Sequence, residues 1–93
     1  MDIDRLEKQV EIVQLARLIE IKPVASSNIL GIGYDEEHQL LKVAFRNKDS
    51  YNTYVYENVE PEVYSKIAGA ESVGTILREC VINNKEKYNY IKL

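Results

Sequence analysis

The chain has 93 residues, of which 45% are hydrophobic and 29% charged, so it can form one domain with a modest core. Its net charge of −3 argues against a general DNA-binding protein, whose affinity comes from many Lys and Arg contacts to phosphate. A single Cys80 and a single His38 provide neither an intrachain disulfide nor a Cys/His zinc set. No apolar run approaches the roughly 20 residues of a membrane span. We therefore expect a cytoplasmic protein that uses no metal and no cofactor.

Residues 1–22 are predicted to be an N-terminal amphipathic oligomerisation helix that runs from Asp2 to Ile21. Its apolar residues fall on two sides, whereas a helix that lies on its own domain needs only one apolar face. One side holds Ile3, Leu6, Val10 and Val13, and the opposite side holds Ile12, Leu15, Ala16 and Ile19. We expect one side to pack on the domain of its own chain, and we assign the second set to the interface of a homo-oligomer. The alternative is a helix clasped within a single domain by later elements.

Residues 23–93 are predicted to form an α+β domain that begins with a three-stranded antiparallel meander. Its strands are expected at 29–34, 40–46 and 51–56, since β-branched and aromatic residues alternate there and the connections are short. In the third strand Tyr54 and Tyr56 share one face. In the first, Gly31 and Gly33 indicate a bulge or close approach by another backbone or a ligand.

Two helices and a short C-terminal strand complete the predicted fold. Pro61 suits the first turn of a helix that Gly69 stops, and Ser72 is a candidate N-cap for a second helix that reaches Asn83-Asn84. Residues 88–93 alternate and predict a strand on a sheet edge. The fold class is therefore α+β: an N-terminal helix, a three-stranded antiparallel meander, two helices and a short C-terminal strand.

The residues with catalytic potential are isolated from one another, and we predict that the protein is not an enzyme. His38 lies in a turn among acids and is interpreted as a surface residue. Cys80 has helical spacing with Ile76 and Leu77, which is typical of a buried small hydrophobe rather than a nucleophile.

Binding has stronger support, because the chain holds seven tyrosines and several basic residues near them. Tyrosine stacks on nucleobases, and an arginine fork binds phosphate. The alternative is that Tyr54, Tyr56 and Tyr64 are core residues whose hydroxyls reach the rim. The candidate ligand-binding residues are Tyr34, Arg46, Lys48, Tyr54, Tyr56, Arg78, Tyr88 and Tyr90.

A series of short segments in fixed order resembles the KTSC family, small domains named for a C-terminal extension of some lysyl-tRNA synthetases. The segments are 26–29, 32–35, the Tyr-x-Tyr of 54–56, Pro61 with 63–64, Ser-Val-Gly at 72–74, and Tyr-Asn-Tyr at 88–90. Members also occur as single-domain bacterial and phage proteins. The resemblance implies an α+β domain with a suspected role in RNA binding, and it leaves the N-terminal helix outside.

Three functions remain open at this point. The first is a non-catalytic module that binds RNA or a nucleotide through tyrosines and a local basic patch. The second is a homo-oligomer, of a size that suits phage proteins, that sequesters a small cyclic nucleotide signal between subunits. The third is a protein-interaction or inhibitor module with no small ligand.

Overall fold

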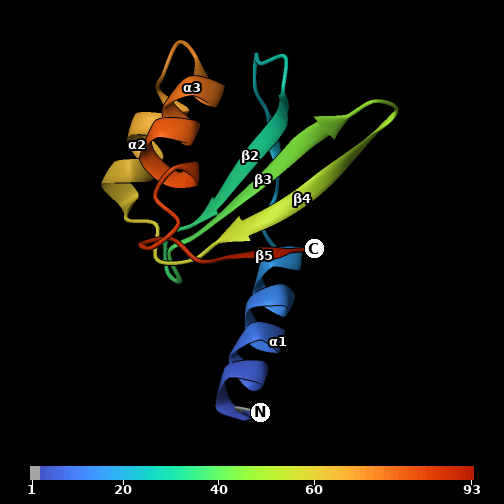
Figure 1. Cartoon of the computed structure of the whole chain (residues 1–93), viewed down its shortest axis with the longest axis vertical. Coiled ribbons are helices and arrows are strands. Elements are labelled where there is room, and N and C mark those ends of the chain that lie inside the picture. Colours follow the sequence, from blue (N-terminus) through green and yellow to red (C-terminus); the bar gives the residue numbers. More distant parts are fainter. Residues whose placement is uncertain (1–2) are drawn as a thin grey trace.

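A five-stranded antiparallel sheet forms the centre of the computed structural model, which describes residues 3–93 (Figure 1). Its strands lie side by side in sequence order, so the predicted meander is present as β2, β3 and β4. The predicted C-terminal strand is β5, and it occupies a sheet edge as expected. The count of strands in the prediction was too low, because β1 was missed. The strands are β1 (Lys22–Pro23), β2 (Ile29–Asp35), β3 (Leu40–Asn47), β4 (Ser50–Tyr56) and β5 (Tyr90–Lys92).

The two glycines of β2 explain how β1 joins the sheet. Pro23 lies opposite Gly31 at the edge of the sheet, where a missing N–H is tolerated. A methyl group added to Gly31 would lie 2.6 Å from the carbonyl oxygen of Lys22, so only glycine fits beneath this strand. The β2–β3 register also shifts between Ile29 and Gly31. Of the predicted reasons for the glycines, the close approach of another backbone is therefore confirmed, and the irregular register before Gly31 lies where a bulge was the alternative.

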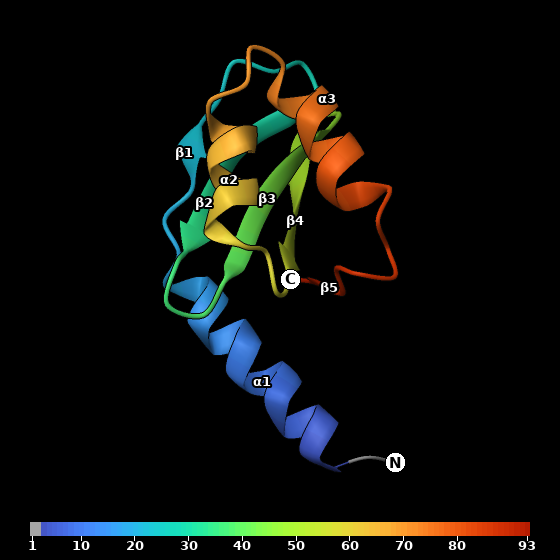
Figure 2. The same ribbon diagram turned by 90° about the vertical axis from the view of Figure 1, so that its left-hand side faces the viewer.

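Three helical segments cover one face of the sheet: α2 (Pro61–Ala68), α3 (Val73–Leu77) and η1 (Arg78–Ile82), as Figure 2 shows. Ser72 is the N-cap residue of α3, as predicted, although its hydroxyl bonds that of Thr75 rather than a backbone N–H. The second half of the predicted helix widens into the π-helical segment η1. The main core lies between these helices and the sheet. Its fully buried members include Ile29, Leu41, Val43, Val59, Ile67, Leu77 and Val81.

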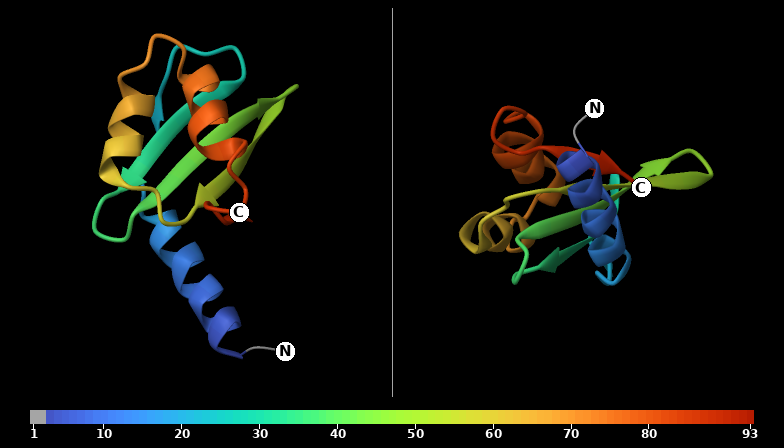
Figure 3. Two further views of the ribbon diagram at one scale, coloured as in Figure 1. Left: turned by 60° about the vertical axis from the view of Figure 1, so that its left-hand side comes forward. Right: turned by 90° about the horizontal axis from the view of Figure 1, so that it is seen from below.

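The helix α1 (Ile3–Arg17) packs on the opposite face of the sheet through its C-terminal half only. There, a second and smaller core joins Ile12, Ala16 and Ile19 to Leu40 and Val55. The helix ends at Arg17 rather than Ile21, and residues 18–21 lead into β1. The first half of α1 projects away from the rest of the molecule, as the left-hand view of Figure 3 shows.

This arrangement reverses the assignment of the two helix faces. Ile12, Ala16 and Ile19 were assigned to a partner subunit, but they are 0–8% exposed and Leu15 packs beside them, within their own chain. Periodicity revealed two apolar faces without showing which one the sheet would cover. The side left open is that of Ile3, Leu6 and Val10. Within residues 3–93, no helix is long and apolar enough to cross a membrane.

Candidate functional site

An open hollow of about 360 Å³ lies where β3 and β4 meet η1 and the segment leading to β5. We call it the tyrosine pocket, because most of its wall is aromatic. Its lining residues are Phe45, Asn52, Tyr54, Tyr56, Val81, Ile82, Lys85, Tyr88 and Tyr90.

The sheet register builds the aromatic wall. Alternation along β4 directs Asn52, Tyr54 and Tyr56 to the helix-covered face, and Phe45 of β3 lies opposite Asn52. The rings of Phe45 and Tyr54 meet edge to face with centroids 5.6 Å apart. The pairing of β4 with β5 adds Tyr90, whose centroid lies 5.8 Å from that of Tyr54. The pocket is therefore a continuous aromatic surface drawn from three strands.

Two of its tyrosines are structural as well as pocket-lining. Tyr56 is 7% exposed, and burial, followed by the neighbouring Tyr54 and Tyr90, raises the pKa of its phenol to about 12. Tyr88 is 3% exposed and donates a hydrogen bond of 3.1 Å to Glu60 just before α2. Burial opposes ionisation of Glu60, but hydrogen bonds from Tyr88 and Lys87 outweigh it and lower the pKa of that carboxyl. The base of the pocket is consequently fixed.

A second hollow of about 410 Å³ adjoins the first, because Phe45 and Ile82 line both. We call it the serine hollow; besides those two residues it is lined by Ala25, Ser26, Ser27, Asn28, Ile29, Glu71, Ser72, Val73, Gly74, Thr75 and Arg78.

The polar groups of the serine hollow differ in what they are free to bind. The Ser26 hydroxyl accepts the N–H groups of Asn28 and Ile29 at 3.3 and 3.2 Å. The Ser72 hydroxyl donates to that of Thr75 at 2.8 Å. Arg78, the exposed first residue of η1, has no side-chain hydrogen bond or ion pair within residues 3–93. The hollow thus offers an uncommitted guanidinium beside a pre-ordered polar loop.

The structure brings five of the eight candidate ligand residues to these two hollows: Tyr54, Tyr56, Arg78, Tyr88 and Tyr90.

The other three candidates lie elsewhere. Tyr34 stacks on Tyr64 with centroids 4.4 Å apart and donates its hydroxyl hydrogen bond to Val59. Arg46 is paired in register with an exposed tyrosine on the opposite face of the sheet, and Lys48 occupies the β3–β4 turn with a positive φ of 48°. None of these side chains lines either hollow.

Several lining residues were missed by the sequence analysis. Asn52 could have been found, because it precedes Tyr54 by two residues and therefore shares its face. Phe45 required the β3–β4 register, and Lys85 lies in the connection before β5, where no local pattern distinguishes it. The joining of Ser26–Asn28 to Ser72–Thr75 depends on how α3 packs over β2, which no local pattern shows.

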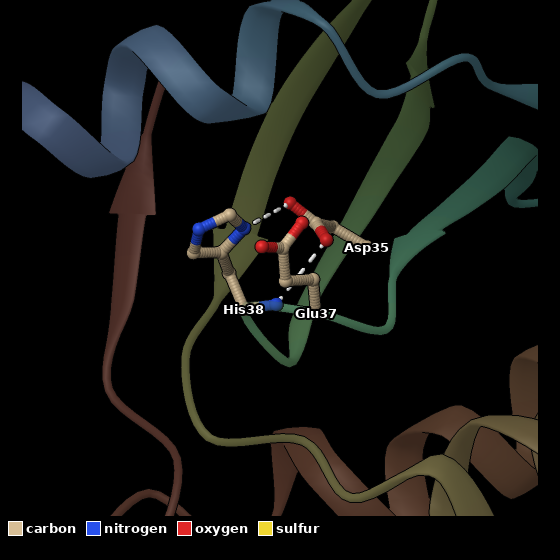
Figure 4. Close-up of side chains that lie close together, drawn as sticks. All are labelled: Asp35, Glu37 and His38. Atoms are coloured by element: carbon tan, nitrogen blue, oxygen red, sulfur yellow. Dashed lines mark hydrogen bonds and ion pairs between the residues drawn. The ribbon is translucent and has the colours of Figure 1, made fainter.

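A separate cluster at the β2–β3 turn holds Asp35, Glu37 and His38, with one ligand atom from each within 4.8 Å of the others (Figure 4). Asp35 accepts the backbone N–H of His38 at 3.2 Å and its Nδ1 at 2.8 Å. The hydrogen bond that the His38 ring donates to Asp35 raises the pKa of His38. Exposed acidic groups are common without an ion, and these bonds give the cluster a role in shaping the turn.

Comparison with known proteins gives the family. The KTSC domain model matches residues 25–90. This chain belongs to the KTSC domain family. A KTSC domain protein from Yersinia pestis has a crystal structure that superposes with a TM-score of 0.67 and 32% identity, covering 81% of this chain and 97% of that one. The resemblance expected from the short segments is confirmed, and α1 lies before the matched range.

Two bacterial relatives also match. One from Tsukamurella paurometabola is 38% identical over 61 residues, or 66% of this chain and 87% of the relative. An uncharacterized protein from Stutzerimonas stutzeri is 43% identical over 49 residues, or 53% of this chain and 65% of that protein. Four of the KTSC segments, 26–29, 54–56, 72–74 and 88–90, contribute residues to the two hollows. The other two, 32–35 and Pro61 with 63–64, lie outside them, and Tyr34 there stacks on Tyr64.

Proposed function

We propose that this KTSC domain is a non-catalytic binding module for a nucleotide unit. The base occupies the tyrosine pocket and the phosphate occupies the serine hollow. The observation that carries the proposal is the continuity of the two hollows through Phe45 and Ile82, which sets an aromatic surface beside an uncommitted arginine. Their volumes lie in the range of small-molecule sites, about 300–1,000 Å³.

The tyrosine pocket has the chemistry that a base requires. Tyr90 is 55% exposed, so the pocket presents an accessible aromatic ring beside the half-buried Tyr54. A base stacked on an aromatic side chain gains about 1–3 kcal/mol. The Asn52 amide supplies both a donor and an acceptor for the edge of a base, and Lys85 supplies a positive charge at the rim.

The serine hollow suits a phosphate. The Arg78 guanidinium can donate two parallel hydrogen bonds to phosphate oxygens, which a lysine cannot do. The hydroxyl of Ser27 and the amide of Asn28 lie in the same hollow on the exposed loop before β2. The groups with catalytic potential do not gather here: His38 belongs to the β2–β3 turn, and Cys80 packs against the main core.

A phosphate-linked base has two sources, a free nucleotide or the end of an RNA. The net charge of −3 disfavours an extended RNA footprint, which needs many cationic contacts. Sequestration of a small cyclic nucleotide by an oligomer is the second candidate. The apolar face of α1 left open by the fold favours it.

The test is calorimetric titration with adenosine and guanosine monophosphates, a cyclic dinucleotide and a short single-stranded RNA. Tyr54→Leu and Arg78→Gln should each weaken binding about 5- to 150-fold, as expected for a lost stack or charged hydrogen bond. The matched controls are Tyr51→Leu and Arg46→Gln, which change the same residue types on the opposite face of the sheet. These two should bind as the unmodified protein does.

Salt separates the two ligand sources. RNA affinity should fall steeply with added salt, with a logarithmic slope of about 0.7 per phosphate contacted, whereas a single nucleotide should show a slope near that of one contact. Absence of binding to every probe would overturn the proposal in favour of a protein-interaction module. Equal losses in Arg78→Gln and Arg46→Gln would overturn the location of the site.

A further inference from the structure

The first half of α1 carries large apolar side chains that remain exposed among the residues that the structure describes, 3–93. Every residue from 3 to 11 is exposed, and the helix projects from the domain in Figures 1 and 2 and in the left-hand view of Figure 3. Ile3, Leu6 and Val10 are 67%, 49% and 51% exposed. An isolated helix of about 12–15 residues is marginal in water, so half a helix with an apolar side exposed lacks the packing that normally stabilises it.

The spacing of these residues is that of a helix seam. Ile3, Leu6, Val10 and Val13 follow one another at alternating intervals of three and four residues, and Arg17 takes the next place. This is the pattern of a and d positions in a two-helix coiled coil. The seam, which we call the outer stripe, is distinct from the face of Ile12 and Ala16 that packs on the sheet.

A hollow of about 340 Å³ runs beside the outer stripe. It lies between α1 and β5, which provides Ile91, and its other lining residues are Leu6, Gln9, Val10, Val13, Gln14 and Arg17. The outer stripe is therefore not merely a ridge. It borders a mostly apolar recess that can accept side chains from a second helix.

We infer that the outer stripe binds the outer stripe of a second copy of this chain, with the two helices antiparallel. A two-fold arrangement makes one surface complementary to itself. Charge selects the relative direction of the two helices. Arg17 ends the stripe and Glu7 flanks it. Neither side chain has a hydrogen bond or ion pair within residues 3–93. Parallel helices would set Arg17 beside Arg17, whereas antiparallel helices bring each Arg17 toward the partner's Glu7.

The interface is small, because a register that sets Arg17 beside the partner's Glu7 brings only Leu6, Val10 and Val13 of each copy against the other helix. Interfaces below about 1,200 Å² are characteristic of weak or transient association. We therefore expect a dimer that forms reversibly in the micromolar range, independently of whether a nucleotide is bound.

Sedimentation velocity over a series of protein concentrations tests this inference without any ligand. The unmodified chain should move from one copy, 10.7 kDa, toward twice that mass as concentration rises. Val10→Asp should raise the protein concentration at the midpoint of dimer formation at least 10-fold, or abolish the dimer. The control is Leu18→Asp: Leu18 is 83% exposed and apolar but lies outside the outer stripe, so its change should leave the midpoint unaltered.

Charge reversal tests the direction of the helices. Glu7→Arg and Arg17→Glu should each weaken the dimer, and the double variant should restore it, with circular dichroism confirming that every variant is folded. A monomer at all concentrations would overturn the inference, as would equal effects of Val10→Asp and Leu18→Asp. Failure of the double variant to recover would overturn the antiparallel arrangement.

Discussion

Gly33→Ala tests how the segment after α1 is held against the sheet. A methyl group at Gly33 would overlap the carbonyl oxygen of Glu20 and lie 2.7 Å from the Cγ2 atom of Ile19. Glu20 and its neighbours cannot retreat freely, because Ile19 is buried and its carbonyl accepts a hydrogen bond of 3.2 Å from the Lys42 ammonium. The added carbon must therefore displace backbone rather than a flexible side chain.

Overpacking of this kind costs about 1–3 kcal/mol of unfolding free energy. At the size of this domain, each kcal/mol lowers the melting temperature by about 4–8 °C. Gly74→Ala is the matched control, because a methyl group there meets its nearest atoms at 3.5 and 3.7 Å, which is ordinary contact. Within α3 that change should be neutral or gain up to about 1 kcal/mol from helix propensity.

The assay is urea unfolding of both variants, followed by circular dichroism. The slope of free energy against urea reports whether the folded state stays equally compact, so a lower midpoint at an unchanged slope isolates the change in stability. A Gly33→Ala protein as stable as the original would refute the close crossing of residues 19–22 over β2. A loss in Gly74→Ala equal to that in Gly33→Ala would point to a general sensitivity to added methyl groups.

Two titrations follow from the pKa shifts. Burial raises the pKa of Tyr56 to about 12, so the folded phenol keeps a proton that the unfolded phenol loses near pH 10. The free energy of unfolding should therefore fall as the pH rises from about 10 to about 12. Tyr56→Phe should flatten this dependence in unfolding experiments. The hydrogen bond that His38 donates to Asp35 raises the pKa of His38, so the stabilising effect of this bond is full below about pH 6.5 and lost above the folded pKa. Asp35→Asn should lower that pKa in an NMR titration of His38; an unchanged value would contradict the contact.

Much of the fold could be predicted because the strand signals were local. The alternation of residues 51–56 indicated a strand with Tyr54 and Tyr56 on one face, and that face became a wall of the pocket. β1 could not be predicted in the same way, since Lys22–Pro23 is too short for any alternation. The only indication of β1 in the sequence was indirect: Gly31 and Gly33 of β2 leave room for a neighbouring backbone.

The site was less predictable than the fold, because tertiary packing decides which side chains share a hollow. Tyr34 and Tyr54 are equally plausible as stacking residues in the sequence. In the structure, the first is stacked on Tyr64 beneath α2 and the second lies in the tyrosine pocket. Arg46 follows Phe45 directly, yet alternation along the strand sends it to the opposite face.

The most direct test of the nucleotide proposal is an amide NMR titration of the isotopically labelled chain with a nucleoside monophosphate and, separately, a cyclic dinucleotide. We expect saturable shifts concentrated at Asn52, Tyr54, Arg78 and Tyr90, with Arg46 and Tyr51 unmoved as internal references. No saturable shift with either compound, or shifts centred on Arg46 and Tyr51, would contradict it.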